Sequence, residues 1–212
     1  MRKRARPPRA APASVGDRIL ATATDLFYRE GIRAVGIQRV IDEAGIAKAS
    51  LYAHYASKDE LVAACLKRRG DAVRSALEAR LVEPGLDARG KLLALFDAQI
   101  ESVESDEFRG CPFLNASSEI AETGHPARRV IAAQRKWLHD LIGGLVKDTG
   151  AKASESLTGT LVVLFDGGLS SSLVDGSPAA ARHARWAAEQ ILEGHLPQRP
   201  PRKRGRRAAR KR

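Results

Sequence analysis

The sequence predicts an all-α protein. Apolar residues recur every three or four positions through most of the 212 residues, which is the spacing of one face of a helix. Valine, isoleucine and aromatic residues do not alternate with polar residues over any stretch long enough to indicate a strand. Glycine and proline interrupt the apolar pattern at intervals, as they do where helices end. Together these observations favour a bundle of helices.

Four helices are expected in the N-terminal part of the chain. Ser14 followed by Asp17 resembles a capping box and opens the first helix, which Gly31 closes. Ser57 opens the fourth helix, whose inward-facing residues are expected to include Val73. The expected spans are about 15–30, 37–44, 48–54, and 58 to the Pro84-Gly85 pair.

Longer helices are expected beyond Gly85. Residues 108–112 break the pattern, and Pro112 is placed to begin the next helix because proline suits the first turn. The expected spans are about 86–105, 112–119, 126–148, 154–174 and 178–194.

The net charge of +11 is concentrated at the two ends of the chain. Residues 1–13 carry five Lys or Arg, residues 199–212 carry nine, and neither segment has an acidic residue. The remainder has 22 basic and 25 acidic residues. This charge favours a polyanionic partner, nucleic acid before an anionic membrane surface, although tails that only aid solubility explain it as well. We expect 1–13 and 197–212 to be disordered basic tails.

Several classes of protein are disfavoured. No run of 18 apolar residues predicts a membrane span, and no apolar region of a signal peptide follows the basic start. Cys65 and Cys111 are too few for a disulfide framework and lack metal-ligand spacing, so we expect buried thiols, no metal and a cytoplasmic location. The common catalytic motifs are missing, and the neighbours His139 and Asp140 would point about 100° apart on a helix. We therefore expect no enzyme and no cofactor.

Residues 36–55 have the spacing of a helix-turn-helix. Two short helices flank Gly45-Ile46-Ala47, a three-residue turn that begins with glycine. In that motif the second helix lies in the major groove of DNA and the first crosses the backbone, although similar helix pairs also occur in ordinary bundles. The side chains that lie off the apolar faces would meet DNA: Gln38, Arg39, Lys48, Ser50, Tyr52, His54 and Lys58.

The chemistry of these side chains suits DNA. Lys48 and Lys58 stand at helix starts, and they and the Tyr52 hydroxyl can reach phosphate oxygens. Gln38 can present its amide to the edge of an adenine. Other roles stay open: Tyr52 could be a packing residue, His54 could cap its helix, and the lysines could be solvated.

Residues 31–61 resemble the N-terminal domain of the TetR (tetracycline repressor-like) family of transcriptional regulators. The strongest match is residues 44–61, Ala-Gly-Ile-Ala-Lys-Ala-Ser-Leu-Tyr-Ala-His-Tyr-Ala-Ser-Lys-Asp-Glu-Leu. The resemblance implies a helix-turn-helix domain over 14–70 and a helical effector-binding and dimerisation domain over 71–196. It also implies a homodimeric, sequence-specific regulator, a repressor that leaves its double-stranded DNA operator when a small molecule binds.

The family's DNA-contacting positions correspond to the residues named above, with Gln38 at a base-facing position. Three departures from the family pattern affect the motif. Val35-Gly36 replaces a frequent Thr-Thr pair, and Ala47 replaces a Ser or Thr cap, a change that costs about 1 kcal/mol of local helix stability. Ala53 stands where the family often has Arg, so the recognition helix has few side chains that can read sequence.

The C-terminal part carries weaker signals. Residues 110–115 resemble a segment that borders the ligand cavity in one branch of the family, and four residues are expected in its wall: Phe96, Phe113, Asn115 and Trp137. Residues of these kinds are more often simple core residues than ligand contacts. Small residues among the leucines of the last two helices fit pairing across a two-fold axis, and ordinary packing within one chain explains them as well.

The C-terminal tail contains Arg204-Gly205-Arg206, which resembles the core of an AT-hook. Such a core enters the narrow minor groove of A·T-rich DNA. Arg207 stands where the hook usually has proline, and a nonspecific polycation explains the same charges. The competing function is therefore an architectural or nonspecific nucleic-acid binder that acts through its tails.

Overall fold

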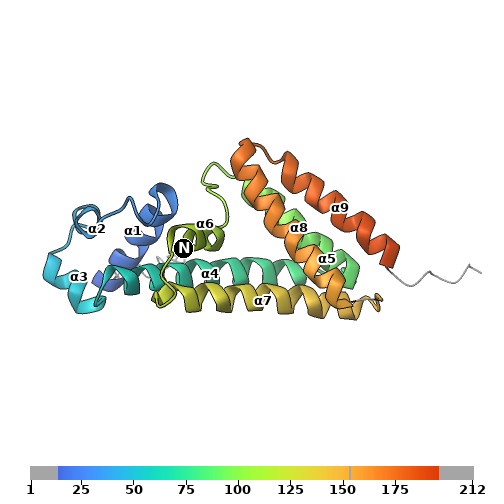
Figure 1. Cartoon of the computed structure of the whole chain (residues 1–212), viewed down its shortest axis with the longest axis horizontal. Coiled ribbons are helices and arrows are strands. Elements are labelled where there is room, and N and C mark those ends of the chain that lie inside the picture. The colour runs from blue at the N-terminus through green and yellow to red at the C-terminus, as the bar shows by residue number, and fades with distance from the viewer. Residues whose placement is uncertain (1–13, 153, 196–212) are drawn as a thin grey trace, which may run out of the picture.

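The computed structural model describes residues 14–152 and 154–195, and this part of the chain folds into nine helices without a strand (Figure 1). The all-α prediction is confirmed, and the helices begin and end close to the expected residues. They are α1 (Val15–Glu30), α2 (Ile37–Ala44), α3 (Lys48–His54), α4 (Lys58–Leu81), α5 (Ala88–Val103), α6 (Pro112–Glu119), α7 (Pro126–Asp148), α8 (Ser154–Asp175) and α9 (Ala179–His195).

Helices α4 and α7 lie side by side and form the long axis of the molecule (Figure 1). At one end α1, α2 and α3 pack around the start of α4, and at the other end α5, α8 and α9 pack together. Helix α6 lies between the two groups and contacts α4 and α7. Because α4 runs through residue 70 without a break, one continuous helix crosses the predicted domain boundary.

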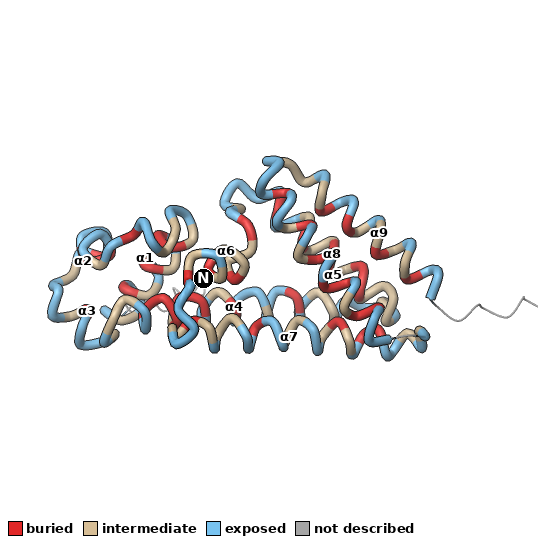
Figure 2. Tube along the Cα trace, viewed as in Figure 1, coloured by how far each residue is buried: buried red, intermediate tan, exposed pale blue. Residues whose placement is uncertain are grey.

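Two clusters of buried apolar residues hold these groups together, and Figure 2 shows them in red along the inner sides of the helices. The first cluster combines Val40 and Leu51 of the short helices with residues of α1 and α4. It also contains Phe113 and Ala116 of α6. The second cluster joins α5, α7, α8 and α9 to Leu77 near the end of α4. Helix α6 thus shares a core with the N-terminal helices, so a movement of α6 would reach them.

The helix ends follow local chemistry. Ser14 and Asp17 form the predicted capping box at the start of α1. The Ser57 hydroxyl accepts a hydrogen bond from the Glu60 N–H at 3.1 Å and caps α4. One expectation is wrong: Val73 is 37% exposed because α4 is covered by other helices on only part of its surface at this point.

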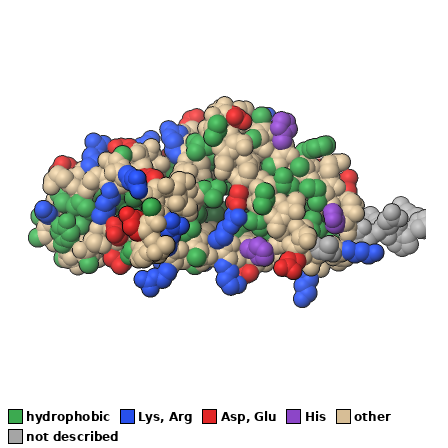
Figure 3. Space-filling view, in the orientation of Figure 1, with side chains coloured by type: hydrophobic (Ala, Val, Ile, Leu, Met, Phe, Trp, Pro, Cys, Tyr) green, Lys and Arg blue, Asp and Glu red, His purple; other side chains and the backbone are tan. Residues whose placement is uncertain are grey.

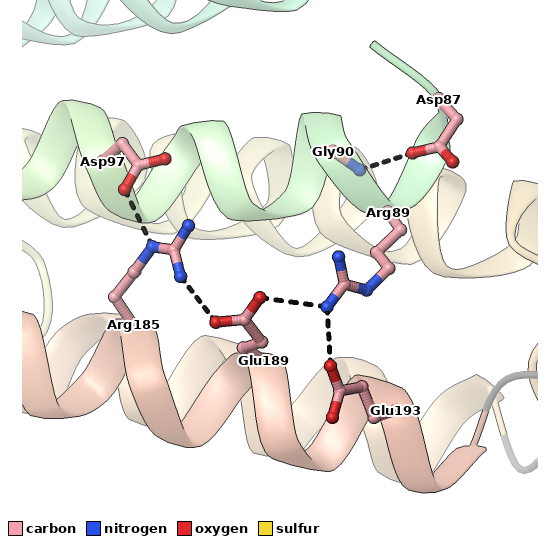
Figure 4. A network of polar contacts seen from close by, with 7 residues as sticks. All are labelled: Asp87, Arg89, Gly90, Asp97, Arg185, Glu189 and Glu193. Carbon is pink, nitrogen blue, oxygen red and sulfur yellow. Dashed lines mark hydrogen bonds and ion pairs between the residues drawn. The ribbon is translucent and has the colours of Figure 1, made fainter.

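An ion-pair network ties α9 to α5 (Figure 4). Arg185 donates to Asp97 of α5 at 2.9 Å and to Glu189 at 2.7 Å. Arg89 of α5 donates to Glu189 and to Glu193 of α9, both at 3.0 Å. The hydrogen bond to Asp97 raises the pKa of Arg185 further. Glu189 is the centre of the network because it accepts from both arginines.

Helix α8 is, within the described part of the chain, the one helix long and apolar enough to cross a membrane, with a mean hydropathy of 1.4 over its most apolar window. No such helix was expected, because the sequence has no run of 18 apolar residues. Its inner face packs in the second cluster, and helices in the core of a protein can be equally long and apolar. On its outer face Val163 and Val174 are 67% and 84% exposed. The outer face of the helix therefore carries two exposed valines among serine, threonine and glycine residues.

Candidate nucleic-acid interface

The turn between α2 and α3 has the geometry that the sequence predicts. Gly45 adopts the left-handed conformation (φ 62°, ψ 47°), which glycine reaches without strain. Its N–H donates to the carbonyls of Asp42 and Ile41 in the last turn of α2. Helix α3 begins three residues later. Val40 and Ile41 of α2 and Leu51 of α3 are buried in the first cluster, so the two helices are fixed against α1 and α4. This leaves the opposite face of α3 at the surface.

The exposed face of α3 carries the side chains expected to meet DNA. Lys48, Tyr52 and His54 are exposed, and Ser50 is half-buried. Tyr52 is 45% exposed, which is unusual for an aromatic residue that serves only the core. Apolar side chains, shown in green, also cover this end of the molecule in Figure 3. The face combines donors for phosphate with apolar surface for the groove.

His54 has a contact that the sequence did not predict. A side chain at Gly16 would come within 3.2 Å of the His54 ring, so the ring lies against the first turn of α1. The glycine therefore makes room for the histidine, which serves to place α3 on α1.

Gln38 and Arg39 are exposed on α2 and already have partners on their own side of the motif. Gln38 Nε2 donates to Asp42 Oδ1 at 2.8 Å, which orients the amide. Arg39 lies 3.5 Å from Glu30 and 3.7 Å from Glu43 in exposed ion pairs. Such pairs contribute only about 0–1 kcal/mol, so a phosphate group can replace them.

Lys58 differs from Lys48 although both begin a helix. It is partly buried, and its Nζ lies 5.8 Å from the centre of the Phe27 ring on α1. Burial lowers the pKa of its ammonium group. Its charge is thus directed toward the junction of α1 and α4 and is less available to solvent than that of Lys48.

The four residues predicted to line a ligand pocket do not come together in one cavity. Phe96 is fully buried and packs edge-on against Phe165, with 5.5 Å between ring centres. Phe113 lies in the first cluster, and Trp137 faces the guanidinium of Arg74 at 5.3 Å. Asn115 alone among them borders a cleft of about 410 Å³ between α1, α4 and α6.

Arg69 of α4 also lines this cleft, and sequence reasoning missed it. It lies 3.6 Å from the centre of the Tyr28 ring on α1. The two residues are far apart in the sequence and neither belongs to a motif, so only the packing of the helices brings them together.

Two further predictions concern metal binding and the basic tails. In the described ranges no group of three His, Cys, Asp or Glu residues could hold a metal ion. The two basic tails, with Arg204 and Arg206, lie outside the residues that the structure describes.

Comparisons with known proteins agree with this architecture. The family model for bacterial regulatory proteins of the tetR family matches residues 19–65. The crystal structure of SCO4454, a TetR-family transcriptional regulator from Streptomyces coelicolor, is 32% identical, covers 85% of this chain and 95% of its own, and gives a TM-score of 0.80.

Two curated regulators are also similar in sequence. The transcriptional activator FasR of Mycolicibacterium smegmatis is 34% identical over 137 residues, which are 64% of this chain and 60% of FasR. The transcriptional repressor KstR2 of the same organism is 31% identical over 93 residues, 44% of this chain and 45% of KstR2. The matches thus span a little under half to about 60% of these two regulators.

Proposed function

The chain belongs to the TetR family of DNA-binding transcriptional regulators, and we propose that it represses transcription from a palindromic operator in the cytoplasm until a small molecule releases it. The observation that carries this proposal is the α2 and α3 pair, whose inner residues are buried and whose outer face on α3 is exposed and carries polar side chains. A helix fixed in this way can enter the major groove without rearrangement of the protein.

We assign the contacts by reach and chemistry. Lys48 and Tyr52 bind phosphate oxygens, as does Arg39 after exchange of its exposed carboxylate partners. Gln38 reads a base edge, held in orientation by Asp42. Ser50 faces the DNA from the first turn of α3, and His54 reaches a phosphate from the last turn with the ring edge that does not lie against Gly16. Lys58 binds phosphate only where its ammonium group turns from the Phe27 ring toward the groove.

A homodimer fits the outer faces of α8 and α9. Large apolar side chains exposed on these two helices are Val163, Val174 and Trp186, at 67%, 84% and 62% exposure. Apolar side chains lie over this part of the surface in Figure 3. A second copy of the chain, related by a two-fold axis, would bury this surface. The resulting dimer would place two recognition helices on the two half-sites of an operator.

Release by an effector requires a path from its site to α3. The sharing of the first cluster between α6 and the N-terminal helices supports such a path, because a ligand that shifts α6 also shifts residues packed beneath α2 and α3. Only a ligand that binds the two conformations unequally can change DNA affinity.

Selection of duplexes from a random DNA pool tests the proposal. We expect the full chain to enrich a near-palindromic sequence. Gln38→Ala should relax the preference at one position in each half-site by about 1–3 kcal/mol and leave the other positions unchanged, because a single amide reads a single base pair.

Two results would contradict the assignment. If the pool shows no sequence preference, the protein acts as a nonspecific binder through its basic tails. If Gln38→Ala weakens all duplexes equally, Gln38 contacts the phosphate backbone and not a base.

A further inference from the structure

A cleft lies between α1, α4 and α6. It has a volume of about 410 Å³, which is within the range of small-molecule sites. Most of its wall is apolar, with Phe27 of α1, Val62 and Leu66 of α4 and Ala116 of α6 among the lining residues. An apolar molecule of moderate size would therefore be desolvated in it.

Arg69 adds a positive charge to this apolar wall. Its guanidinium stacks on the Tyr28 ring, and its Nε is buried without a hydrogen-bond partner. Asp25 and Glu107 act on it through space, yet in the described residues no carboxylate lies within 4 Å of its nitrogens. Partial burial lowers the pKa of the group because it removes water from the guanidinium. A partly buried cation without a carboxylate partner is a candidate binding position for an anion.

The other charged groups around the cleft already have partners. Arg29 pairs with Asp25 at 3.4 Å, and the guanidinium of Arg109 donates to the carbonyl of Phe108 at 2.7 Å. Glu119 accepts from the backbone N–H of Arg33 at 2.8 Å. Glu30 lies 3.5 Å from Arg39. Of the five charged residues that line the cleft, Arg69 is therefore the one that makes neither a hydrogen bond nor an ion pair in the described part of the chain.

From these observations we propose that the cleft binds a small organic carboxylate, with its carboxylate on Arg69 and its apolar body against α4 and α6. One cation matches one negative charge. A phosphate group carries more negative charge, so Glu30 and Glu119, which also line the cleft, would repel it more strongly than a carboxylate. The planar guanidinium, whose central carbon lies 3.6 Å from the centre of the Tyr28 ring, suits the two oxygens of a carboxylate.

The position of the cleft gives the ligand a route to DNA binding, a step that rests on the function proposed above. The Tyr28 hydroxyl donates to the Gly110 carbonyl at 3.0 Å and accepts from the Arg109 N–H at 2.9 Å. These bonds connect α1 to the segment that precedes α6. A carboxylate on Arg69 lies beside this connection, so its binding would shift α1 relative to α6.

Calorimetric titration of the full chain without DNA tests the site. The probes are octanoate and 4-phenylbutyrate, with octanol, 4-phenylbutanol and inorganic phosphate as comparisons. We expect each carboxylate to bind about 10- to 100-fold more tightly than its alcohol, the range that a hydrogen bond to a charged group contributes. Arg69→Met should remove this difference while the alcohols still bind, which shows that the cleft remains folded.

Two variants control for charge. Arg68→Met removes an exposed arginine from the neighbouring position of α4 and should leave carboxylate binding unchanged. Arg69→Lys should retain part of the preference for the carboxylates. Equal binding of acid and alcohol, binding of phosphate as tight as that of the carboxylates, or no binding of either acid at millimolar concentration would each overturn the site.

A second measurement separates the site from the regulatory function. The carboxylates should weaken binding to the selected operator for the wild-type chain and not for Arg69→Met. If they bind in the titration and leave operator affinity unchanged, the link to DNA release is wrong. If no operator is selected at all, the DNA-binding proposal fails, and the titration still decides whether the site exists.

Discussion

Lys48 and Lys58 occupy the same position relative to a helix start but have different surroundings. Lys48 is exposed on α3, whereas Lys58 is partly buried beside the Phe27 ring. A cation in water exchanges readily to a phosphate, and a cation held over an aromatic ring must first leave it. Of the two, Lys48 is the residue whose contribution to DNA binding should be purely electrostatic.

We expect Lys48→Ala to weaken binding to every duplex by a similar factor. The loss of one phosphate contact should reduce the slope of log K against log salt by about one. Binding measured over a salt series checks this. Lys147→Ala, at the far end of α7, removes the same charge away from α2 and α3 and should leave the slope unchanged. Equal slopes for wild type and Lys48→Ala would show that Lys48 does not reach the backbone.

At the scale of residues, exposure was predictable where the helical period alone decides it. Gln38, Arg39 and Tyr52 lie off the apolar face of a helix that packs on one side, and all three are exposed. The surroundings of Phe96 and Arg69 depend on helices that are distant in the sequence. No local pattern indicates that Phe96 packs on Phe165 or that Arg69 stacks on Tyr28.

Among the helices, α3 begins without a side-chain cap. Ala47 holds the N-cap position in an extended conformation (φ −76°, ψ 147°), which is the conformation of a capping residue, but it has no side-chain acceptor. The backbone is thus ready for a cap that the sequence does not supply.

Ala47→Ser should therefore stabilise the protein by about 0.5–1 kcal/mol, because the new hydroxyl can accept from an N–H of the first turn. Urea denaturation followed by circular dichroism measures the change in the free energy of unfolding. Ala49→Ser serves as the control: it is exposed inside the same helix, where serine is less favourable than alanine, and should give no gain. A loss of stability in both variants would contradict the capping argument.

Helix ends were predictable because they depend on nearby residues, and the assembly of the helices was not. Ser14, Gly45 and Pro112 mark their boundaries through caps and backbone conformation within a few residues. That α6 packs with the N-terminal helices follows from contacts between remote segments, as does the exposure of Val73. The pairing of charges between α5 and α9 is a feature of the same kind.

Glu189 provides a test of that pairing. It accepts from Arg89 and Arg185, and its side chain is 28% exposed (Figure 4). Glu189→Ala leaves two arginines with fewer partners and should lower the free energy of unfolding by about 1–2 kcal/mol. This is the contribution of a charge-assisted hydrogen bond, reduced because the side chain is partly exposed. Glu193→Ala removes a more exposed carboxylate that pairs with Arg89 alone and should cost about 0–1 kcal/mol. Equal losses in chemical denaturation would mean that the network adds nothing to single pairs.

For the molecule as a whole, the outer surface of α8 and α9 matters most. Val163 and Val174 on α8 and Trp186 on α9 are large apolar side chains that remain exposed to water, and their burial in an interface would be favourable. One recognition helix reads few base pairs, so a second copy is also needed for specificity. A dimer through this surface meets both requirements.

The test of this arrangement is Trp186→Lys. In a two-fold interface each residue occurs twice, so one substitution places two charges in the apolar contact. We expect the dimer to weaken by at least about 2 kcal/mol, the cost of losing a central aromatic residue, and a monomer to form at micromolar concentration in light scattering. Operator binding should fall together with the dimer, whereas a single half-site, which one subunit contacts, should be bound as before. Val82→Lys, at a 79% exposed position after α4, adds the same charge elsewhere and should leave the dimer intact. If Trp186→Lys remains dimeric, the subunits meet through another surface, and the apolar faces of α8 and α9 need another explanation.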